Sequence, residues 1–141
     1  MRKEQVLTKL QSIIEESRVG VLSTISKGKP NGRYMTFFNE GITIYTPTNK
    51  NMYKIEDMVT NPHVHIILGY EGEGYGDTYA EIEGVGVLST DEELKSRLWN
   101  DTLSTYFSGP NDPNYVVIVI EPKKVTIMND EQSNGPQVIS L

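Results

Sequence analysis

Cysteine is absent from this chain of 141 residues. Disulfide bonds, thiolate nucleophiles and cysteine-ligated metals are therefore excluded. Long apolar runs are also missing: the longest uninterrupted one is Val116–Ile120, which is far too short to span a bilayer. The first residues carry mixed charge and no apolar stretch of the kind that a secretory signal needs. We therefore expect a cytoplasmic protein.

Positive charge is scarce as well. The chain has 13 Lys and Arg residues against 19 Asp and Glu residues, a formal net charge of −6. Binding to nucleic acid or to an anionic membrane depends on clustered positive charge, so we expect neither partner. A small anionic ligand in a local basic pocket stays compatible with this composition. Apolar residues make up 37%, which fits one domain over residues 1–141 whose core a subunit interface helps to complete.

Histidine is limited to His63 and His65, which lie two apart on a predicted strand and hence on one face. Two imidazoles can bind a metal, but no third ligand lies nearby, so we expect a structural role and no metal site. Either histidine can also lie near a subunit interface. The same scarcity leaves no Ser/His/Asp triad, and no acid/base pair stands out.

The single tryptophan, Trp99, is expected to pack in the core or at a dimer contact.

The hydrophobic patterns predict many short strands and few helices. Helical spacing of apolar residues indicates helices over 3–17, 52–60 and 91–106. Glycine, proline and asparagine separate the predicted strands, which are 19–25, 33–38, 42–46, 63–68, 78–89, 115–121 and 125–128. The polar segment 129–141 is expected to be a flexible tail. Six or seven strands joined by tight turns, with helices at the edges, predict a mainly β fold, a small antiparallel barrel that is closed or split.

The order of several short motifs resembles the pyridoxamine 5′-phosphate oxidase-like FMN-binding split barrels, and most closely their general stress protein 26 branch. The match runs from about residue 5 to residue 128. No single piece is diagnostic; the order and spacing together carry the resemblance. The pieces are Gly20–Thr24, Gly32-Arg33, Ile44–Thr46, Lys54 followed by Asn61-Pro62, Glu83-Gly84, Leu98–Asn100, Tyr106-Phe107, Gly109 and Asp112-Pro113.

The resemblance implies a homodimer with two FMN molecules in clefts at the subunit interface. It implies that Arg33 and Lys54 hold the FMN phosphate. It places Tyr34, Met35 and Thr36 along the flavin, with Tyr45 and Thr46 completing the floor, and Tyr79 contributed by the second subunit.

The chemistry of these residue types agrees with that assignment. A phosphate dianion favours a planar, bidentate arginine together with the point charge of a lysine. Lys54 falls near the start of a predicted helix, whose dipole also favours an anion. Because strand side chains alternate, Arg33 and Met35 share one face while Tyr34 and Thr36 share the other. One face can therefore serve the cofactor and the other the core.

Two departures limit what the resemblance implies. Met52 and Tyr53 stand where the oxidases usually have a serine or arginine before the phosphate-binding lysine. The oxidase segment that contacts pyridoxal phosphate has no counterpart after Met128, so pyridoxamine phosphate oxidase activity is not expected. The leading hypothesis is an FMN-dependent oxidoreductase acting on an unknown small molecule. Alternatives are a non-catalytic flavin-binding or stress-response module, a relative that binds F420 or haem, and a barrel without cofactor.

Overall fold

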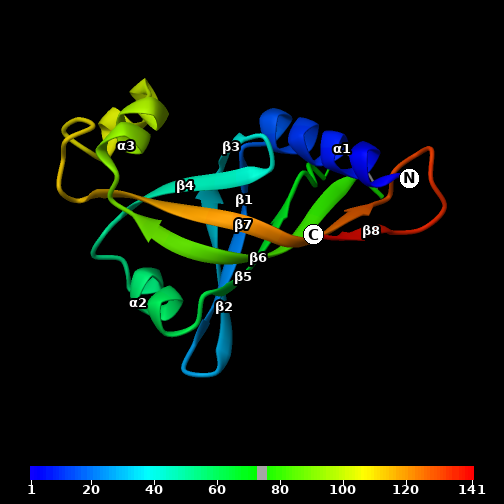
Figure 1. Ribbon diagram of the computed structural model, residues 1–141, viewed down its shortest axis with the longest axis horizontal. Helices are drawn as coiled ribbons and strands as arrows, with labels where there is room; N and C mark the ends of the chain where they lie inside the picture. The colour runs from blue at the N-terminus through cyan, green and yellow to red at the C-terminus, as the bar shows by residue number, and fades with distance from the viewer. Residues whose placement is uncertain (73–75) are drawn as a thin grey trace.

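One curled antiparallel sheet organises the molecule (Figure 1). The computed structural model describes residues 1–72 and 76–141, and in these ranges eight strands follow the order β2-β1-β5-β6-β7-β4-β3, with β8 paired to β7. The strands are β1 (Val19–Ser26), β2 (Lys29–Thr36), β3 (Phe38–Glu40), β4 (Thr43–Asn49), β5 (His63–Leu68), β6 (Tyr79–Ser89), β7 (Tyr115–Met128) and β8 (Gln137–Ser140). The predicted mainly β, antiparallel fold is confirmed. The short strands β3 and β8 raise the number of strands above the six or seven expected.

In the part of the chain that the structure describes, four helical segments flank this sheet. Figure 1 shows α1 (Lys3–Glu16) near the two termini, with α2 (Tyr53–Thr60) and α3 (Glu92–Leu98) toward the opposite end. A short 3₁₀ helix, η1 (Asp101–Thr105), follows α3. In the described ranges, the helices are too short or too polar to traverse a lipid bilayer.

The hairpin between β1 and β2 turns earlier than predicted. Lys27 and Gly28 have φ angles of 52° and 77°, the left-handed conformations that a two-residue hairpin turn uses. As a result β2 begins at Lys29 and not at Arg33, and it pairs with β1 along its full length. Pro30 is tolerated because β2 is an edge strand, where a missing N–H leaves no ladder bond unmade.

A single long strand, β7, replaces the two strands that were predicted around Pro122. The pairing of β6 with β7 shifts register between Glu83 and Gly84, and Gly84 lies opposite Pro122. The prediction of a strand end was wrong because an irregularity of this kind accommodates the hydrogen bond that proline cannot donate. A Cβ on Gly84 would lie 2.7 Å from the carbonyl oxygen of Glu121, so the two backbones approach closely here.

The predicted helix over 91–106 is divided into α3 and η1. Asn100 has an extended backbone, and its side-chain oxygen accepts a hydrogen bond of 3.0 Å from the Thr102 N–H. This local bond competes with the helix, so α3 ends and η1 begins. Trp99 sits at the break and packs against Tyr115, with ring centroids 5.6 Å apart.

Two hydrophobic clusters lie on opposite faces of the sheet. The larger fills the inner side of the curl and receives Val6, Leu10, Ile13 and Ile14 from α1. The smaller lies between the outer face of β4 and β7 and the α3–η1 segment; its buried members are Tyr45, Leu94, Leu103, Phe107, Tyr115 and Val117. Alternation along β4 and β7 sends neighbouring residues into the two clusters. The segment 129–141, expected as a flexible tail, carries β8, which pairs with β7.

Candidate functional site

A cleft opens where the two ends of the curled sheet meet. Strand β2 and strand β4 approach each other there, and the Thr46 hydroxyl donates a hydrogen bond of 2.8 Å to the backbone oxygen of Thr36. The cleft has a volume of about 430 Å³. Its lining comes from β1, β2, β3, β4, α2 and the η1 region: Val19, Tyr34, Met35, Thr36, Phe38, Pro47, Thr48, Asn49, Met52, Lys54, Thr102, Leu103, Tyr106 and Phe107.

Four of the residues that the sequence singled out meet in this cleft, namely Tyr34, Met35, Thr36 and Lys54. Tyr34 is 78% exposed, so its ring stands at the mouth of the cleft. Strand β4 contributes Pro47, Thr48 and Asn49 to the wall, one step farther along than the predicted Tyr45 and Thr46.

Lys54 is a buried cation, with only 3% of its surface exposed. Burial, and after it the neighbouring positive charge of Arg33, lower the pKa of Lys54 from 10.5 to about 8. Within residues 1–72 and 76–141, no carboxylate forms an ion pair with this ammonium group. A buried ammonium beside a guanidinium is unfavourable in an empty protein and is compensated when an anion binds between them.

Arg33 lies on β2 next to the cleft and does not line it. Its Nη1 donates to the Thr24 hydroxyl at 3.0 Å and to the Leu22 backbone oxygen at 3.4 Å. These bonds to β1 hold the half-buried guanidinium in place close to Lys54. Arg33 is therefore near enough for its charge to act on Lys54, and a shared role of the two residues in holding a phosphate stays a prediction.

The other three predicted residues lie elsewhere. The Tyr45 hydroxyl donates 2.9 Å to Glu40 Oε1, and its ring belongs to the smaller hydrophobic cluster. Thr46 is fully buried and supports the cleft only through its bond to Thr36. Tyr79 starts β6, and its ring lies 5.7 Å from that of Tyr70, outside the lining of this chain's cleft. Its contribution from a second subunit stays a prediction.

Sequence reasoning missed the wall formed by the α3–η1 region. Leu103, Tyr106 and Phe107 line the cleft about 50 residues after Lys54 in the chain. Tyr106 is 73% exposed, so most of its ring faces the open side of the cleft wall. The motif Tyr106-Phe107 was noticed in the sequence, but nothing local indicates that it faces β2 and α2.

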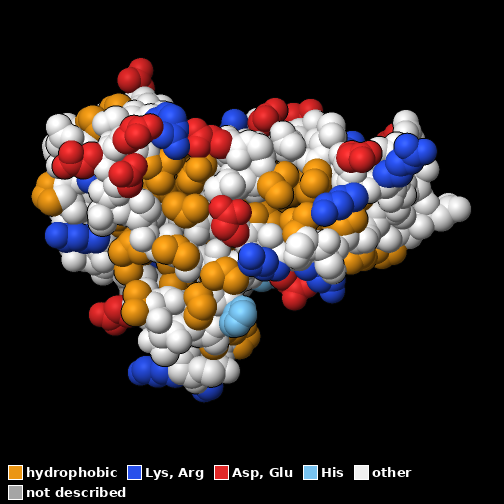
Figure 2. Space-filling model, in the orientation of Figure 1, with side chains coloured by type: hydrophobic (Ala, Val, Ile, Leu, Met, Phe, Trp, Pro, Cys, Tyr) orange, Lys and Arg blue, Asp and Glu red, His pale blue; other side chains and the backbone are white. Residues whose placement is uncertain are grey.

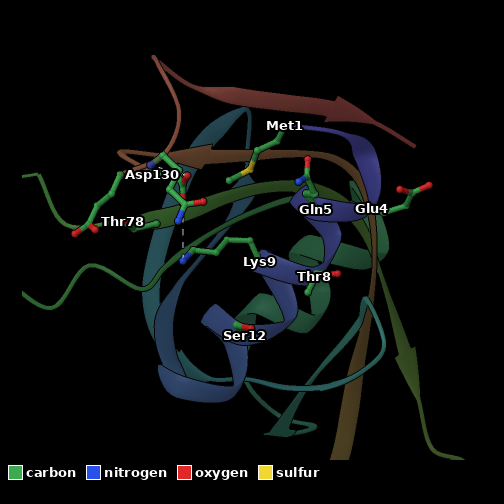
Figure 3. Close-up of a pocket in the computed structure, with 10 residues that line it drawn as sticks. Met1, Glu4, Gln5, Thr8, Lys9, Ser12, Thr78 and Asp130 are labelled. Carbon is green, nitrogen blue, oxygen red and sulfur yellow. Dashed lines mark hydrogen bonds and ion pairs between the residues drawn. The ribbon is translucent and has the colours of Figure 1, made fainter.

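A larger pocket of about 580 Å³ lies between α1 and the segment after β7 (Figure 3). Its lining is polar and carries the acids Glu4, Asp130 and Glu131. Figure 3 shows the Lys9 side chain extending toward Asp130, and the two charged atoms are 3.9 Å apart. This cation is already paired and the pocket has excess negative charge, so an anionic cofactor is not favoured there.

His63 and His65 line a third depression, together with Lys123 and Lys124. His65 lies opposite Ser23 on β1 and Glu83 on β6, on the outer face of the sheet. No group of three or more metal-ligating side chains is found among the residues that the structure describes.

Comparison with known proteins gives consistent results. Residues 6–129 match the family model described as pyridoxamine 5′-phosphate oxidase. The chain is 44% identical over 129 residues to general stress protein 26 of Bacillus subtilis strain 168, covering 92% of each protein. The crystal structure of general stress protein 26 from Bacillus anthracis strain Sterne superposes with a TM-score of 0.84, at 34% identity and full coverage of both chains.

More distant structures share the fold alone. A heme binding protein from Mycobacterium smegmatis has a TM-score of 0.78 at 15% identity, over 99% of this chain and 59% of that one. The family model spans nearly the whole chain, and the similarity to general stress protein 26 extends over the same region. The chain therefore belongs to the pyridoxamine 5′-phosphate oxidase family, in which it is similar to general stress protein 26.

Proposed function

We propose that this protein binds FMN in the cleft between β2, β4 and the η1 region and acts as an oxidoreductase on a small molecule. The observation that carries the proposal is the buried Lys54 beside Arg33 at the edge of a mostly apolar cleft. A phosphate group would compensate both positive charges, and a flat aromatic ring system suits the apolar lining.

Each part of the cleft has a distinct task in this proposal. Lys54 and Arg33 hold the phosphate. Tyr34, Met35 and Thr36 lie along the flavin, with Thr46 fixing the backbone of Thr36. When bound, the flavin supplies hydride or electron transfer, and the protein needs only to bind and orient it and to exclude water. The described lining contains no carboxylate and no histidine.

The second part of the proposal is a homodimer. Val87 is 59% exposed on the outer face of β6 and pairs across the sheet with Val119. Val21 and Ile67 are paired on the same face of β1 and β5. Figure 2 shows hydrophobic side chains spread over the sheet between α3 and α2. An exposed apolar sheet face of this kind favours burial against a second copy.

The site is tested by replacing both cations. Arg33→Ala combined with Lys54→Ala should weaken FMN binding about 100-fold or more, because each charged hydrogen-bond donor contributes strongly to phosphate affinity. Lys3→Ala, an exposed lysine on α1, is the matched control. The measurement is a titration of the cofactor-free protein with FMN, alongside circular dichroism to show that the barrel stays folded. Unchanged affinity in the folded double variant contradicts the site.

The dimer is tested separately by light scattering coupled to size-exclusion chromatography. The native protein should elute as a dimer, and Val87→Asp should shift it to a monomer that has lost FMN affinity. A native monomer that binds FMN with full affinity contradicts the interface proposal.

The cytoplasmic location stays a prediction, which fractionation of producing cells tests.

Two alternative functions can be compared with specific observations. The distant relative named as a heme binding protein shares the fold, but the described cleft lining here has no histidine to ligate iron. A non-catalytic flavin module would use the same Lys54–Arg33 pair. The visible spectrum of the purified protein separates haem, F420 and FMN, and turnover with a nicotinamide donor separates an enzyme from a flavin carrier. Pyridoxamine phosphate oxidase activity is not proposed.

A further inference from the structure

Arg97 on α3 makes a two-pronged ion pair with Glu40 on β3. Its Nε lies 2.6 Å from Glu40 Oε2, and its Nη2 lies 2.9 Å from Glu40 Oε1. The Tyr45 hydroxyl on β4 donates to the same Oε1 at 2.9 Å. Helix α3 is thus joined at one carboxylate to the β3–β4 hairpin, which lies far from it in the sequence. We refer to Arg97, Glu40 and Tyr45 as the Arg97 network.

The Arg97 network connects the cleft wall to the sheet. Arg97 lies two residues before Trp99, and the η1 region that follows supplies Leu103 and Tyr106 to the lining of the cleft. The other side of α3 is held by Tyr115, whose hydroxyl donates 2.8 Å to the Lys95 backbone oxygen. Tyr115 fixes the helix to β7. Arg97 fixes it, through Glu40, to β3 and β4, near the place where β2 and β4 approach each other and the cleft opens.

The charges in this network are mutually stabilised. Hydrogen bonds from Arg97 and then from Tyr45 lower the pKa of Glu40, so the carboxylate stays ionised near neutral pH. Desolvation, followed by the hydrogen bond to Glu40, raises the pKa of Tyr45. Bidentate arginine–carboxylate pairs are geometrically specific. Arg97 and Glu40 are nevertheless 44% and 41% exposed, so their attraction is screened by salt and modest in size.

We propose that the Arg97 network positions the α3–η1 wall and thereby determines the width of the cofactor cleft. Arg97 and Glu40 are positioning residues in this proposal, because neither lines the cleft. Tyr45, expected from the sequence as a direct cofactor contact, acts instead through the wall: its ring packs in the same cluster as Leu103 and Phe107 while its hydroxyl holds Glu40. The effect on FMN rests on the proposed function, but the effect on the wall does not.

Trp99 provides a built-in reporter of the wall. It is the single tryptophan of the chain, it is half-buried, and it packs on Tyr115 at the start of the wall. The experiment measures acrylamide quenching of Trp99 fluorescence in the full-length protein without cofactor, and then the FMN dissociation constant of the same samples. The variants are Arg97→Met, Glu40→Gln and the conservative Arg97→Lys.

The matched control is Glu93→Gln. Glu93 accepts a hydrogen bond of 3.2 Å from Arg97 Nη1 within α3, but it does not reach the sheet. Arg97→Met and Glu40→Gln should increase quenching of Trp99 and weaken FMN binding about fivefold, the upper range for a partly exposed pair. Arg97→Lys should recover part of both effects, and Glu93→Gln should change neither.

Unchanged quenching in both Arg97→Met and Glu40→Gln overturns the proposal, as does increased quenching with unchanged FMN affinity. If the native protein does not bind FMN at all, the proposed function fails, whereas the quenching results alone still decide whether the network holds the wall. The two failures are therefore distinguishable.

Discussion

The Lys54 ammonium lies close enough to the Arg33 guanidinium for the charge of the arginine to lower the pKa of the lysine. One residue comes from α2 and the other from β2, and hydrogen bonds to β1 hold the arginine in place. Two adjacent cations, one of them buried, oppose folding of the cofactor-free protein. The arrangement favours an anionic ligand, and this makes the charge of Lys54 the first quantity to test.

Replacing Lys54 with methionine should stabilise the cofactor-free protein. The lowered pKa corresponds to a cost of about 1–3 kcal/mol for keeping the buried lysine charged. Below pH 8 that cost is fully present, because the lysine is protonated in both the folded and the unfolded chain. Between pH 8 and 10.5 the folded chain releases the proton first, so the cost declines as the pH rises.

Urea denaturation at several pH values between 7 and 9.5 measures this effect. The stability difference between Lys54→Met and the native protein should be largest at pH 7 and should shrink above pH 8. Lys3→Met, at an exposed site on α1, should differ from the native protein by the same small amount at every pH. A Lys54 variant that is less stable than the native protein at pH 7 would show that the charge is compensated within the protein.

FMN affinity should fall as the pH rises above 8. The phosphate group keeps its charge over this range, while Lys54 loses its proton in the cofactor-free protein. The decline should approach tenfold per pH unit near pH 9. Titrations between pH 6.5 and 9 measure it, and Lys54→Met should show weak binding that is nearly independent of pH. A flat profile in the native protein would place the phosphate away from Lys54.

The contact between β2 and β4 should depend on the hydroxyl of Thr46. Thr46→Val removes the 2.8 Å bond to the Thr36 backbone oxygen at a fully buried position, and should cost about 1–2 kcal/mol of unfolding free energy. The same change at the half-buried Thr126 on β7 should cost less. Chemical denaturation gives both values, and FMN titration should show weaker binding for Thr46→Val only. Equal losses of unfolding free energy at the two sites would show that the bond from Thr46 to Thr36 adds nothing particular to stability.

Gly84 should not accept a side chain. Gly84→Ala would place a Cβ 2.7 Å from the Glu121 backbone oxygen and 3.1 Å from Ile120 Cγ2, so the paired strands would have to separate. We expect a loss of about 1–3 kcal/mol in stability. Gly109→Ala is the matched control, since nothing lies within 4 Å of a Cβ at that position. Thermal unfolding of the two variants tests this, and similar melting temperatures would contradict the close approach.

Local patterns in the sequence determined much of the fold. The helical spacing of Val6, Leu10 and Ile13 predicted α1, and the strand over 63–68 coincides with β5. Turn chemistry after β1 and the strand–helix order around Lys54 were also readable, because they depend on neighbours within a few residues. The strand and helix order together with the resemblance to the family suggested a joint role for Arg33 and Lys54; the structure shows that the charge of Arg33 acts on Lys54, and the shared phosphate stays a prediction.

Contacts between distant segments decided the rest. Pro122 does not end β7, because the register shift opposite Gly84 accommodates it. Tyr106 and Phe107 become a wall of the cleft only when α3 docks on β4 and β7, and Arg97 finds Glu40 through the same docking. Sequence periodicity reports which face of an element is apolar, but not which distant element covers that face. The sequence by itself therefore determined the elements and their chemistry, while the tertiary structure decided which of them surround the cleft.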